Sequence, residues 1–216
     1  MCDVVILATG GLSYPKTGST GDGYLLAQSF GHTITSLRPA LIPLYIKESD
    51  FNILANLNLK NVKITINNSL NQEIYQDFGE ITFLEKGVGG PLILSASTIL
   101  ELKDYPCVLN LDLKPALTYQ QLENRLDKEI NHNPQASFLS FLTPLLPQKM
   151  IKTFAFYTKI DQKKKAKDLS LLEKKMVIQS LKNFSFTLTG PFPIEEGIIT
   201  AGGVSVAEVN PQTMES

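Results

Sequence analysis

Two glycine-rich stretches near the start of the sequence have the residue types and spacing for contact with a ligand. ATGG, from Ala8 to Gly11, ends an apolar run, and GSTGDG, from Gly18 to Gly23, opens a helical pattern. Glycine allows a sharp turn and lets backbone N–H groups face a ligand without a Cβ in the way. The N-terminus of the following helix, with Thr20 or Asp22 as its N-cap, offers further N–H groups to a phosphate or a ring carbonyl. This spacing fits chemistry in which the backbone approaches something flat or anionic.

Each stretch alone also has a purely structural explanation. Taken alone, the first is more typical of a tight turn after a strand than of a ligand site, and the second is also typical of a well-capped helix. Neither has the GxGxxG spacing of a dinucleotide-binding turn, which does not occur in the sequence. His32, which follows the helix, is more simply interpreted as a helix-closing residue than as an acid–base group. No G-x-S-x-G elbow supports a hydrolase.

The composition is that of an ordinary globular protein and argues against several classes of function. Of the 216 residues, 43% are hydrophobic, and 20 basic residues against 21 acidic ones give a net charge of -1. This balance gives no general case for nucleic acid or an anionic membrane as partner, and the lysine run from Lys163 to Lys167 is interpreted as a solvated linker. No apolar run is long enough to span a membrane. Two histidines and two cysteines without a CxxC, Cys2 and Cys107, predict no metal site and indicate reduced thiols in the cytoplasm.

The elements that must position the glycine stretches begin with the apolar run. Val4 to Ala8 predicts a strand buried on both faces, as in a parallel sheet. Asp22 to Phe30 predicts a helix that ends at Gly31, and Arg38 to Ile46 predicts extended structure. A buried strand needs neighbours, yet no βαβ repeat follows. We therefore expect it to pair with the strand around Ile198 to Thr200 or with a second copy of the chain.

The middle of the sequence changes from a β pattern to a helical one. In NVKITIN, Val62, Ile64 and Ile66 alternate with polar residues and predict a strand with one buried face. The other predicted elements here are strands at Glu73 to Asp77, Glu80 to Leu84 and Cys107 to Leu113, and a short helix that begins near Pro91. The predicted helices that follow are Thr118 to His132, a segment around Pro147 to Phe156, and Asp168 to Lys182, where Leu169, Leu172, Met176, Val177 and Leu181 have helical spacing. From Phe184 onward, the chain returns to extended segments.

This order suggests an insertion, in which two pieces of a host domain flank a β unit and a helical unit. The two glycine stretches, RPALIPL, GVGGP and ITAGGVSVAEVNPQTMES together resemble the BaiN/YhiN-like NAD(P)/FAD-dependent flavoproteins, mainly over residues 1–46 and 197–216. ATGG followed by TGDG is also similar to the wider fumarate-reductase-like flavoproteins. The resemblance implies an α+β fold, with parts of an FAD-binding Rossmann-like domain at residues 1–37 and 190–216. A β-barrel-like insert would occupy residues 38–117 and a helical insert residues 118–183.

The resemblance also implies a cofactor and the residues that contact it. FAD would be the cofactor, and NAD(P)H the electron donor. The residues implied to contact FAD are Thr9, Gly10 and Gly11 along its length, Gly18, Thr20, Gly21, Asp22 and Gly23 at the flavin end, and Gly202 and Gly203 near the isoalloxazine ring. No catalytic residue is implied, because GVGGP at Gly87 to Pro91 replaces the GLSGP-like stretch that follows a Thr-His pair in the family, and Leu84 to Lys86 precede it here.

Two parts of the family pattern are missing from the sequence: the ADP-binding GxGxxG turn and the C-terminal segment that completes the flavin pocket. We therefore expect the chain to be the substrate-side insert region of a larger FAD-dependent oxidoreductase, inactive and without FAD when alone. The alternative is a non-catalytic interaction or substrate-recognition module without a cofactor. RNA binding by the helical unit is a third reading, which a steep salt dependence would reveal. Expected partners are a small-molecule substrate and a second copy of the chain through unpaired strand edges, with no nucleic acid and no membrane.

Overall fold

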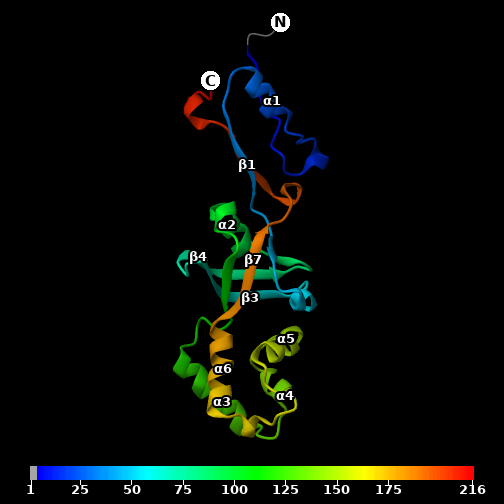
Figure 1. Cartoon of the computed structure of the whole chain (residues 1–216), viewed down its shortest axis with the longest axis vertical. Coiled ribbons are helices and arrows are strands. Elements are labelled where there is room, and N and C mark those ends of the chain that lie inside the picture. Colours follow the sequence, from blue (N-terminus) through cyan, green and yellow to red (C-terminus); the bar gives the residue numbers. More distant parts are fainter. Residues whose placement is uncertain (1–3) are drawn as a thin grey trace.

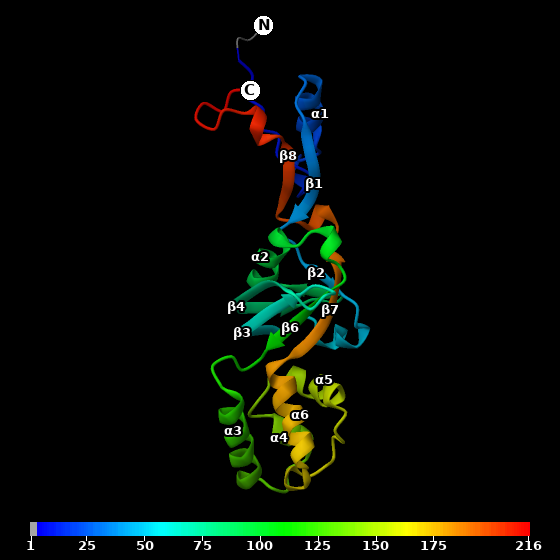
Figure 2. The same ribbon diagram turned by 60° about the vertical axis from the view of Figure 1, so that its left-hand side comes forward.

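The three parts of the molecule lie in a row (Figure 1). The computed structural model describes residues 4–216. The two terminal flanks lie side by side at one end, a barrel lies in the middle, and a helical unit forms the other end, as a second view also shows (Figure 2). The expected α+β fold with a barrel is confirmed. Because of this arrangement, the two ends of the molecule present separate surfaces.

The central barrel is closed by strands in the order β2-β5-β4-β3-β6-β7, and every neighbouring pair is antiparallel. Its strands are β2 Leu44–Ile46, β3 Asn58–Asn67, β4 Glu73–Phe83, β5 Gly87–Gly89, β6 Cys107–Asp112 and β7 Phe184–Pro191. Val62, Ile64 and Ile66 of β3 point inward and are at most 2% exposed, as their alternation predicted. Helix α2 (Pro91–Ile99) packs on β4, with Leu92 against Gly79, and begins at Pro91 as predicted.

Strand β4 corrects one prediction, because it is continuous where the sequence predicted two strands separated by Phe78 and Gly79. Both residues pair with β3, Phe78 with Lys63 and Gly79 with Val62. Near Gly79 the irregularity lies instead in β3, where the register shifts between Leu59 and Val62 and Asn61 adopts a φ of 56°; a second shift occurs at Ile66 and Asn67. A β-bulge of this kind accommodates an extra residue without ending either strand.

Four helices and their connections form the helical unit. They are α3 Tyr119–His132, α4 Phe138–Leu142, α5 Gln148–Thr158 and α6 Leu171–Lys182. Polar caps fix where α3 and α6 begin: the Gln121 amide donates to the Thr118 hydroxyl, and the Glu173 amide to the Ser170 hydroxyl, each with a reciprocal side-chain bond. Such capping boxes satisfy N–H groups that the helix leaves unpaired. The short helix α4 was not predicted, because five residues are too few for a periodic pattern.

Helix α6 corrects a second prediction. It begins at Leu171 and not at Asp168, which belongs to a short 3₁₀ turn. Leu172 and Met176, assigned to the apolar face, are 76% and 46% exposed, while the neighbouring Val177 is fully buried. The buried face of α6 is therefore rotated relative to the one that apolar spacing alone indicated.

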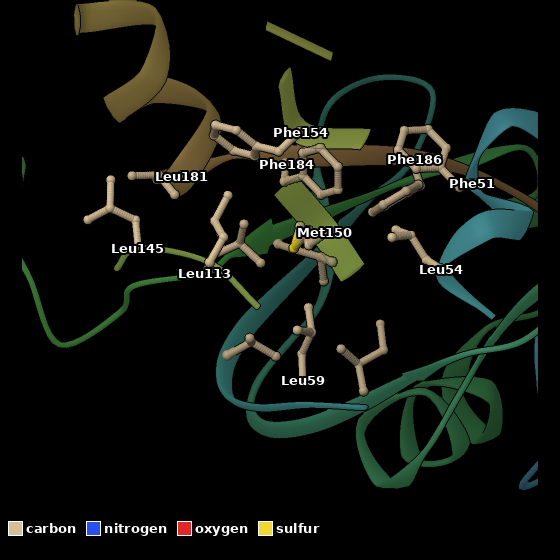
Figure 3. Packing of buried hydrophobic residues seen from close by; sticks show 14 of the residues in the cluster. Phe51, Leu54, Leu59, Leu113, Leu145, Met150, Phe154, Leu181, Phe184 and Phe186 are labelled. Carbon is tan, nitrogen blue, oxygen red and sulfur yellow. The ribbon is translucent and has the colours of Figure 1, made fainter. Parts of the chain in front are cut away.

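The barrel and the helical unit share one hydrophobic core. Helix α6 leads into β7 through Asn183 alone, and the next residue, Phe184, is fully buried. The Phe184 ring lies 5.9 Å from Phe154 of α5, 5.0 Å from Phe186 in the barrel and 5.6 Å from Phe51, measured between ring centroids (Figure 3). Because these aromatic rings come from both parts, the helices are packed against the barrel and are not merely tethered to it.

The two flanks form a small structure of their own at the other end. Helix α1 (Asp22–Ser29) is followed by β1 (Ile34–Ala40), which pairs antiparallel with β8 (Ile199–Val204). The prediction for Val4 to Ala8 was wrong within the described residues, since these residues form no strand and Val4, Val5 and Ile6 are at least 70% exposed. They do not pair with β8, whose partner in the two-stranded sheet is β1. A continuous apolar run specifies a buried strand only where neighbouring strands are present to bury it.

We expect Phe184→Ala to lower the free energy of unfolding by about 3–5 kcal/mol, because the cavity would open where the barrel core meets the helices. Urea unfolding followed by circular dichroism measures the change. Phe156→Ala is the matched control on α5, since the Phe156 side chain is 66% exposed; its effect should stay within about 0.5 kcal/mol. Equal effects of the two substitutions would contradict a shared core.

Candidate functional site

The three glycine stretches come together at the end formed by the flanks. Thr200 of β8 makes the connection: its hydroxyl oxygen accepts hydrogen bonds from the backbone N–H groups of Leu12 at 2.8 Å and Ser13 at 3.1 Å. The Ser13 hydroxyl lies 3.1 Å from the same oxygen. The loop that follows Gly11 is thus held against the strand that contains Gly202 and Gly203.

Tyr24 of α1 lies between the same two stretches. A Cβ placed on Gly11 would lie 2.9 Å from the Tyr24 hydroxyl and 2.6 Å from Thr200 Oγ1. A Cβ on Gly203 would lie 3.4 Å from the Tyr24 ring. We call Gly11, Tyr24, Thr200 and Gly203 the glycine cluster. Tyr24 therefore packs within the site.

Several of the predicted glycines are required by contacts within the chain itself. A Cβ on Gly23 would overlap Thr9 Oγ1, and one on Gly202 would overlap the carbonyl of Ser36. Gly10 and Gly21 have φ values of 74° and 88°, which favour glycine without any ligand. Contacts and backbone conformation within the chain are therefore enough to explain these glycines. The indication of a ligand site is that the three glycine stretches lie together in space.

Gly18 differs from these glycines. Its φ is 95° and no atom lies within 4 Å of the position that a Cβ would take. The surface in front of Gly18 is consequently open, and the backbone there is unobstructed. Thr20, two residues later, is exposed on the same loop.

The start of α1 differs from the prediction. The N-cap is Gly21, with no side-chain hydrogen bond, so neither Thr20 nor Asp22 caps the helix. Asp22 is instead an exposed acidic residue in the first turn. Its negative charge interacts favourably with the helix dipole and disfavours a second anion at this position. The helix start suits a neutral polar edge better than a phosphate.

A hydrogen-bonded carboxylate ties the segment after β8 to the start of β1. Glu208 Oε2 accepts hydrogen bonds from Thr33 N and from His32 Nδ1, both at 3.0 Å. The bonds from Thr33 and His32 lower the pKa of Glu208 below its usual value. His32 follows α1 and, through its contact with Glu208, also connects the two flanks. The sequence alone did not indicate this contact.

The GVGGP stretch and the thiol have structural roles. Gly87 lies in β5, where a Cβ would overlap the carbonyl of Leu44, and Gly90 turns the chain into α2 with a φ of 86°. Cys107 is buried in the barrel, and burial raises the pKa of its thiol to about 12. Cys2 lies outside the described residues. Among residues 4–216, no three His, Cys, Asp or Glu side chains gather in a way that would hold a metal ion.

None of the helices in the described part of the chain has both the length and the apolar character needed to cross a membrane. Apolar side chains are nonetheless exposed at the end formed by the flanks, beside the loops of the glycine cluster. Val4, Val5 and Ile6 lead directly into Thr9, and Leu25 of α1 is 67% exposed.

Comparison with known proteins finds one matching family model and several relatives. The model "HI0933-like protein barrel and H2TH domain" matches residues 38–199. The chain is 29% identical, over 99% of its length, to a 3-dehydro-bile acid delta(4,6)-reductase of Clostridium scindens, covering 53% of that protein. It is 26% and 24% identical to ribosomal RNA dihydrouridine synthases of Haemophilus influenzae and Escherichia coli, over 100% of the chain and 51% of each relative. The chain spans about half the length of the curated relatives it matches.

Thr200→Val should release the loop after Gly11 from β8, because valine keeps the shape of threonine but accepts no hydrogen bond. We expect a local loss of about 1 kcal/mol, seen as roughly fivefold faster hydrogen exchange at the Leu12 and Ser13 amides. Thr200→Ser, which keeps the hydroxyl, should leave exchange at these amides nearly unchanged. Unchanged exchange in the valine variant would show that the loop is held in another way.

The contact of Glu208 predicts a dependence of stability on pH. Since the pKa of Glu208 is lowered in the folded protein, its contribution is complete above the ordinary value of 4.5 and is lost as the pH falls through the lower folded value. Chemical shifts of the Thr33 amide, followed by NMR during acidification, should titrate with a midpoint below 4.5. Glu208→Gln should abolish this titration, whereas a midpoint at or above 4.5 would rule out the contact.

Proposed function

The chain belongs to the HI0933-like family of flavoproteins, the BaiN/YhiN-like proteins, and from this membership we propose that it is the substrate-side region of an FAD-dependent oxidoreductase. In this proposal the flanks complete one side of the FAD site, and the barrel and helices are inserted between them. The larger protein, not the chain alone, carries the activity. NAD(P)H is the proposed electron donor, and the cytoplasm the proposed location.

The observation that carries this proposal is the convergence of the glycine stretches at one end of the molecule. Residues from both ends of the sequence meet through the Thr200 hydroxyl and the Tyr24 ring. Thr200 and Tyr24 would have only a packing role if the surface of the glycine loops were covered by other residues. The surface is open at Gly18, and exposed apolar residues at Val4 to Ile6 precede the first glycine stretch in the sequence.

The residues present fit the ring end of FAD and not its pyrophosphate. The loops of the glycine cluster offer backbone N–H and C=O groups, which match the alternating acceptors and donors along the edge of a flavin ring. Asp22 at the start of α1 disfavours a phosphate there. Bound FAD would supply hydride transfer. Gly18 would allow the ring to approach the backbone, and Thr200 would keep the first loop in place beside Gly202 and Gly203.

The relatives support a reaction class for the larger protein. A 3-dehydro-bile acid delta(4,6)-reductase and a dihydrouridine synthase are both named for reactions that saturate carbon–carbon double bonds. In a 3-oxo compound and in uracil, such a bond is conjugated to a carbonyl group. We therefore propose that the parent protein reduces a double bond conjugated to a carbonyl, with a hydride added to one carbon and a proton to the other.

A non-catalytic recognition module is the second candidate function. It is favoured by the common hydrophobic core of the barrel and the helical unit, which includes no residue of the flanks among the described residues. In that case no cofactor would bind, and the exposed apolar residues of the flanks would contact a partner or a second copy of the chain.

Titration with FAD distinguishes these candidates. We expect the chain alone to be colourless and to show no saturable binding below about 10 μM, because half of the site is absent from it. The full-length gene product should be yellow and carry FAD. Tight binding by the chain alone would contradict the divided site, and a colourless full-length protein would favour the recognition module.

A pair of glycines provides a matched test of the site in the full-length protein. Gly18 and Gly31 have φ values of 95° and 93°, and neither has an atom within 4 Å of its Cβ position. Alanine therefore introduces equal backbone strain at both. Gly18→Ala should weaken FAD binding by about 1–3 kcal/mol, because its methyl group would occupy the surface facing the ring. Gly31→Ala should leave FAD binding unchanged, and equal losses would place Gly18 outside the site.

A further inference from the structure

Positive charge is concentrated in the helical unit. Residues 118–183 contain twelve Lys and Arg residues against six Asp and Glu residues, while the rest of the chain contains eight against fifteen. The net charge of -1 therefore results from a basic end and an acidic remainder. Such segregation creates a local field that attracts polyanions even when the whole chain is nearly neutral.

Part of this charge lies along the exposed side of α5. Lys149, Lys152 and Phe156 follow one another at intervals of three and four residues, which places them on one face of the helix. Lys159 caps the C-terminus of α5 and lines the same hollow as Phe156. Helix α5 contains no acidic residue. Its opposite side is buried, with Met150 and Phe154 in the shared core (Figure 3). We call the face formed by these four residues and Lys163 the basic face.

Two surface hollows accompany the basic face and share Leu139. One, of about 410 Å³, is lined by Ile53, Ser140, Lys149 and Lys152, among others. The other, of about 800 Å³, is lined by Ser137, Phe156, Lys159, Gln162 and Lys163, among others. The second hollow places an exposed aromatic ring beside two ammonium groups and an amide. This is the combination that binds a base and its flanking phosphates.

The charges of the basic face are available to a partner. In the helical unit, Lys164, Lys174 and Lys182 form ion pairs with Glu173, Asp127 and Asp112. Lys152, Lys159 and Lys163 form none with any residue of the described chain, and Lys149 donates only to the carbonyl of Ala55. Asp161, the acidic residue in the larger hollow, accepts a hydrogen bond from the Lys163 amide.

The lysine run is held in place and is not a loose linker. The Ala166 amide donates to the carbonyl of Ala136 at 2.8 Å, and the Lys167 amide to the carbonyl of Pro134 at 3.1 Å. Lys165 also forms a β-bridge with Ser137 at the start of α4. These bonds fix residues 163–167 beside the larger hollow, so Lys163 of the basic face is held at a defined position.

We propose that the basic face is an RNA-binding surface, on which the lysines contact phosphates and Phe156 stacks with an unpaired base. It lies at the opposite end of the molecule from the glycine cluster (Figures 1 and 2). A small substrate held at a flavin cannot contact both ends, but a polymer can. Two relatives named for a reaction on ribosomal RNA agree with this partner. The inference deepens the proposed function by naming RNA as the class of substrate. That RNA is the substrate, and not only a ligand, rests on the proposed oxidoreductase function.

An anionic membrane fits the same charges less well. Helices that bind to membrane surfaces insert an apolar face between the lipids. Helix α5 buries its apolar face in the protein core and presents lysines with a single aromatic ring. The proposal departs from the expectation drawn from net charge, which excluded nucleic acid, and one experiment decides between the two.

The test is fluorescence anisotropy with the full chain and a labelled RNA stem-loop, measured over a range of KCl concentrations without FAD. We expect saturable binding that weakens steeply with salt. Lys152→Gln combined with Lys163→Gln should weaken binding at least tenfold and reduce the slope of log K against log salt by about 1–2. The control, Lys128→Gln with Lys175→Gln, removes the same charge from exposed positions of α3 and α6 and should change binding less than threefold.

Phe156→Ala separates stacking from charge. It should weaken binding to the stem-loop about tenfold, leave the salt slope unchanged and barely affect binding to a fully paired duplex. Absence of RNA binding by the native chain, equal losses in the two lysine pairs, or equal binding to phosphatidylserine vesicles would overturn the proposal. Because no flavin is present, RNA binding and FAD binding can fail independently.

Discussion

The packing of Phe184 where α6 meets β7 determines how the other parts of the molecule are arranged. The chain leaves the helical unit and enters the barrel within two residues, so the first side chain of β7 must belong to both cores. Its contacts with Phe154 on one side and Phe186 on the other meet that requirement. Dispersion and burial at this point hold the helices against the barrel. The basic face of α5 is positioned by the same contacts, because its buried side carries Phe154.

The glycine cluster shows why glycine content alone is weak support for a ligand site. Gly23 and Gly202 have no room for a Cβ because of Thr9 and the Ser36 carbonyl. A search for glycine spacing detects these internal contacts and ligand contacts alike. The meaningful signal is Thr200, whose one hydroxyl accepts two amide hydrogen bonds from a loop nearly two hundred residues earlier in the chain. Nothing in the local sequence marks this threonine except its position before two glycines.

Much of the central fold follows from local sequence patterns, and the terminal parts do not. The alternation of Val62, Ile64 and Ile66 is local and was sufficient to predict a strand with one buried face. The capping box at Ser170 is equally local, yet the predicted start of α6 at Asp168 missed it. The run Val4 to Ala8 was misjudged because burial is a property of neighbours and not of the run itself. Helix α6 was misjudged in its orientation, since Leu172 has the same apolar character as Val177 and only packing distinguishes them. The FAD contacts of the candidate site stay predictions, because they depend on how residues distant in the sequence are arranged and not on local sequence patterns.

The separation of the two ends bears on what the inserted parts do. A lid over a small ligand would have to lie beside the glycine cluster, yet the barrel stands between that cluster and the helical unit (Figure 2). A helical unit at the far end gains nothing from contact with a small molecule at the flavin. It gains from contact with a substrate that extends along the protein, because binding free energy collected at a distant surface lowers the cost of positioning the reacting group. If the proposed RNA surface is correct, charge segregation follows from it: the basic end would attract the polymer, and the acidic remainder would disfavour binding elsewhere on the chain.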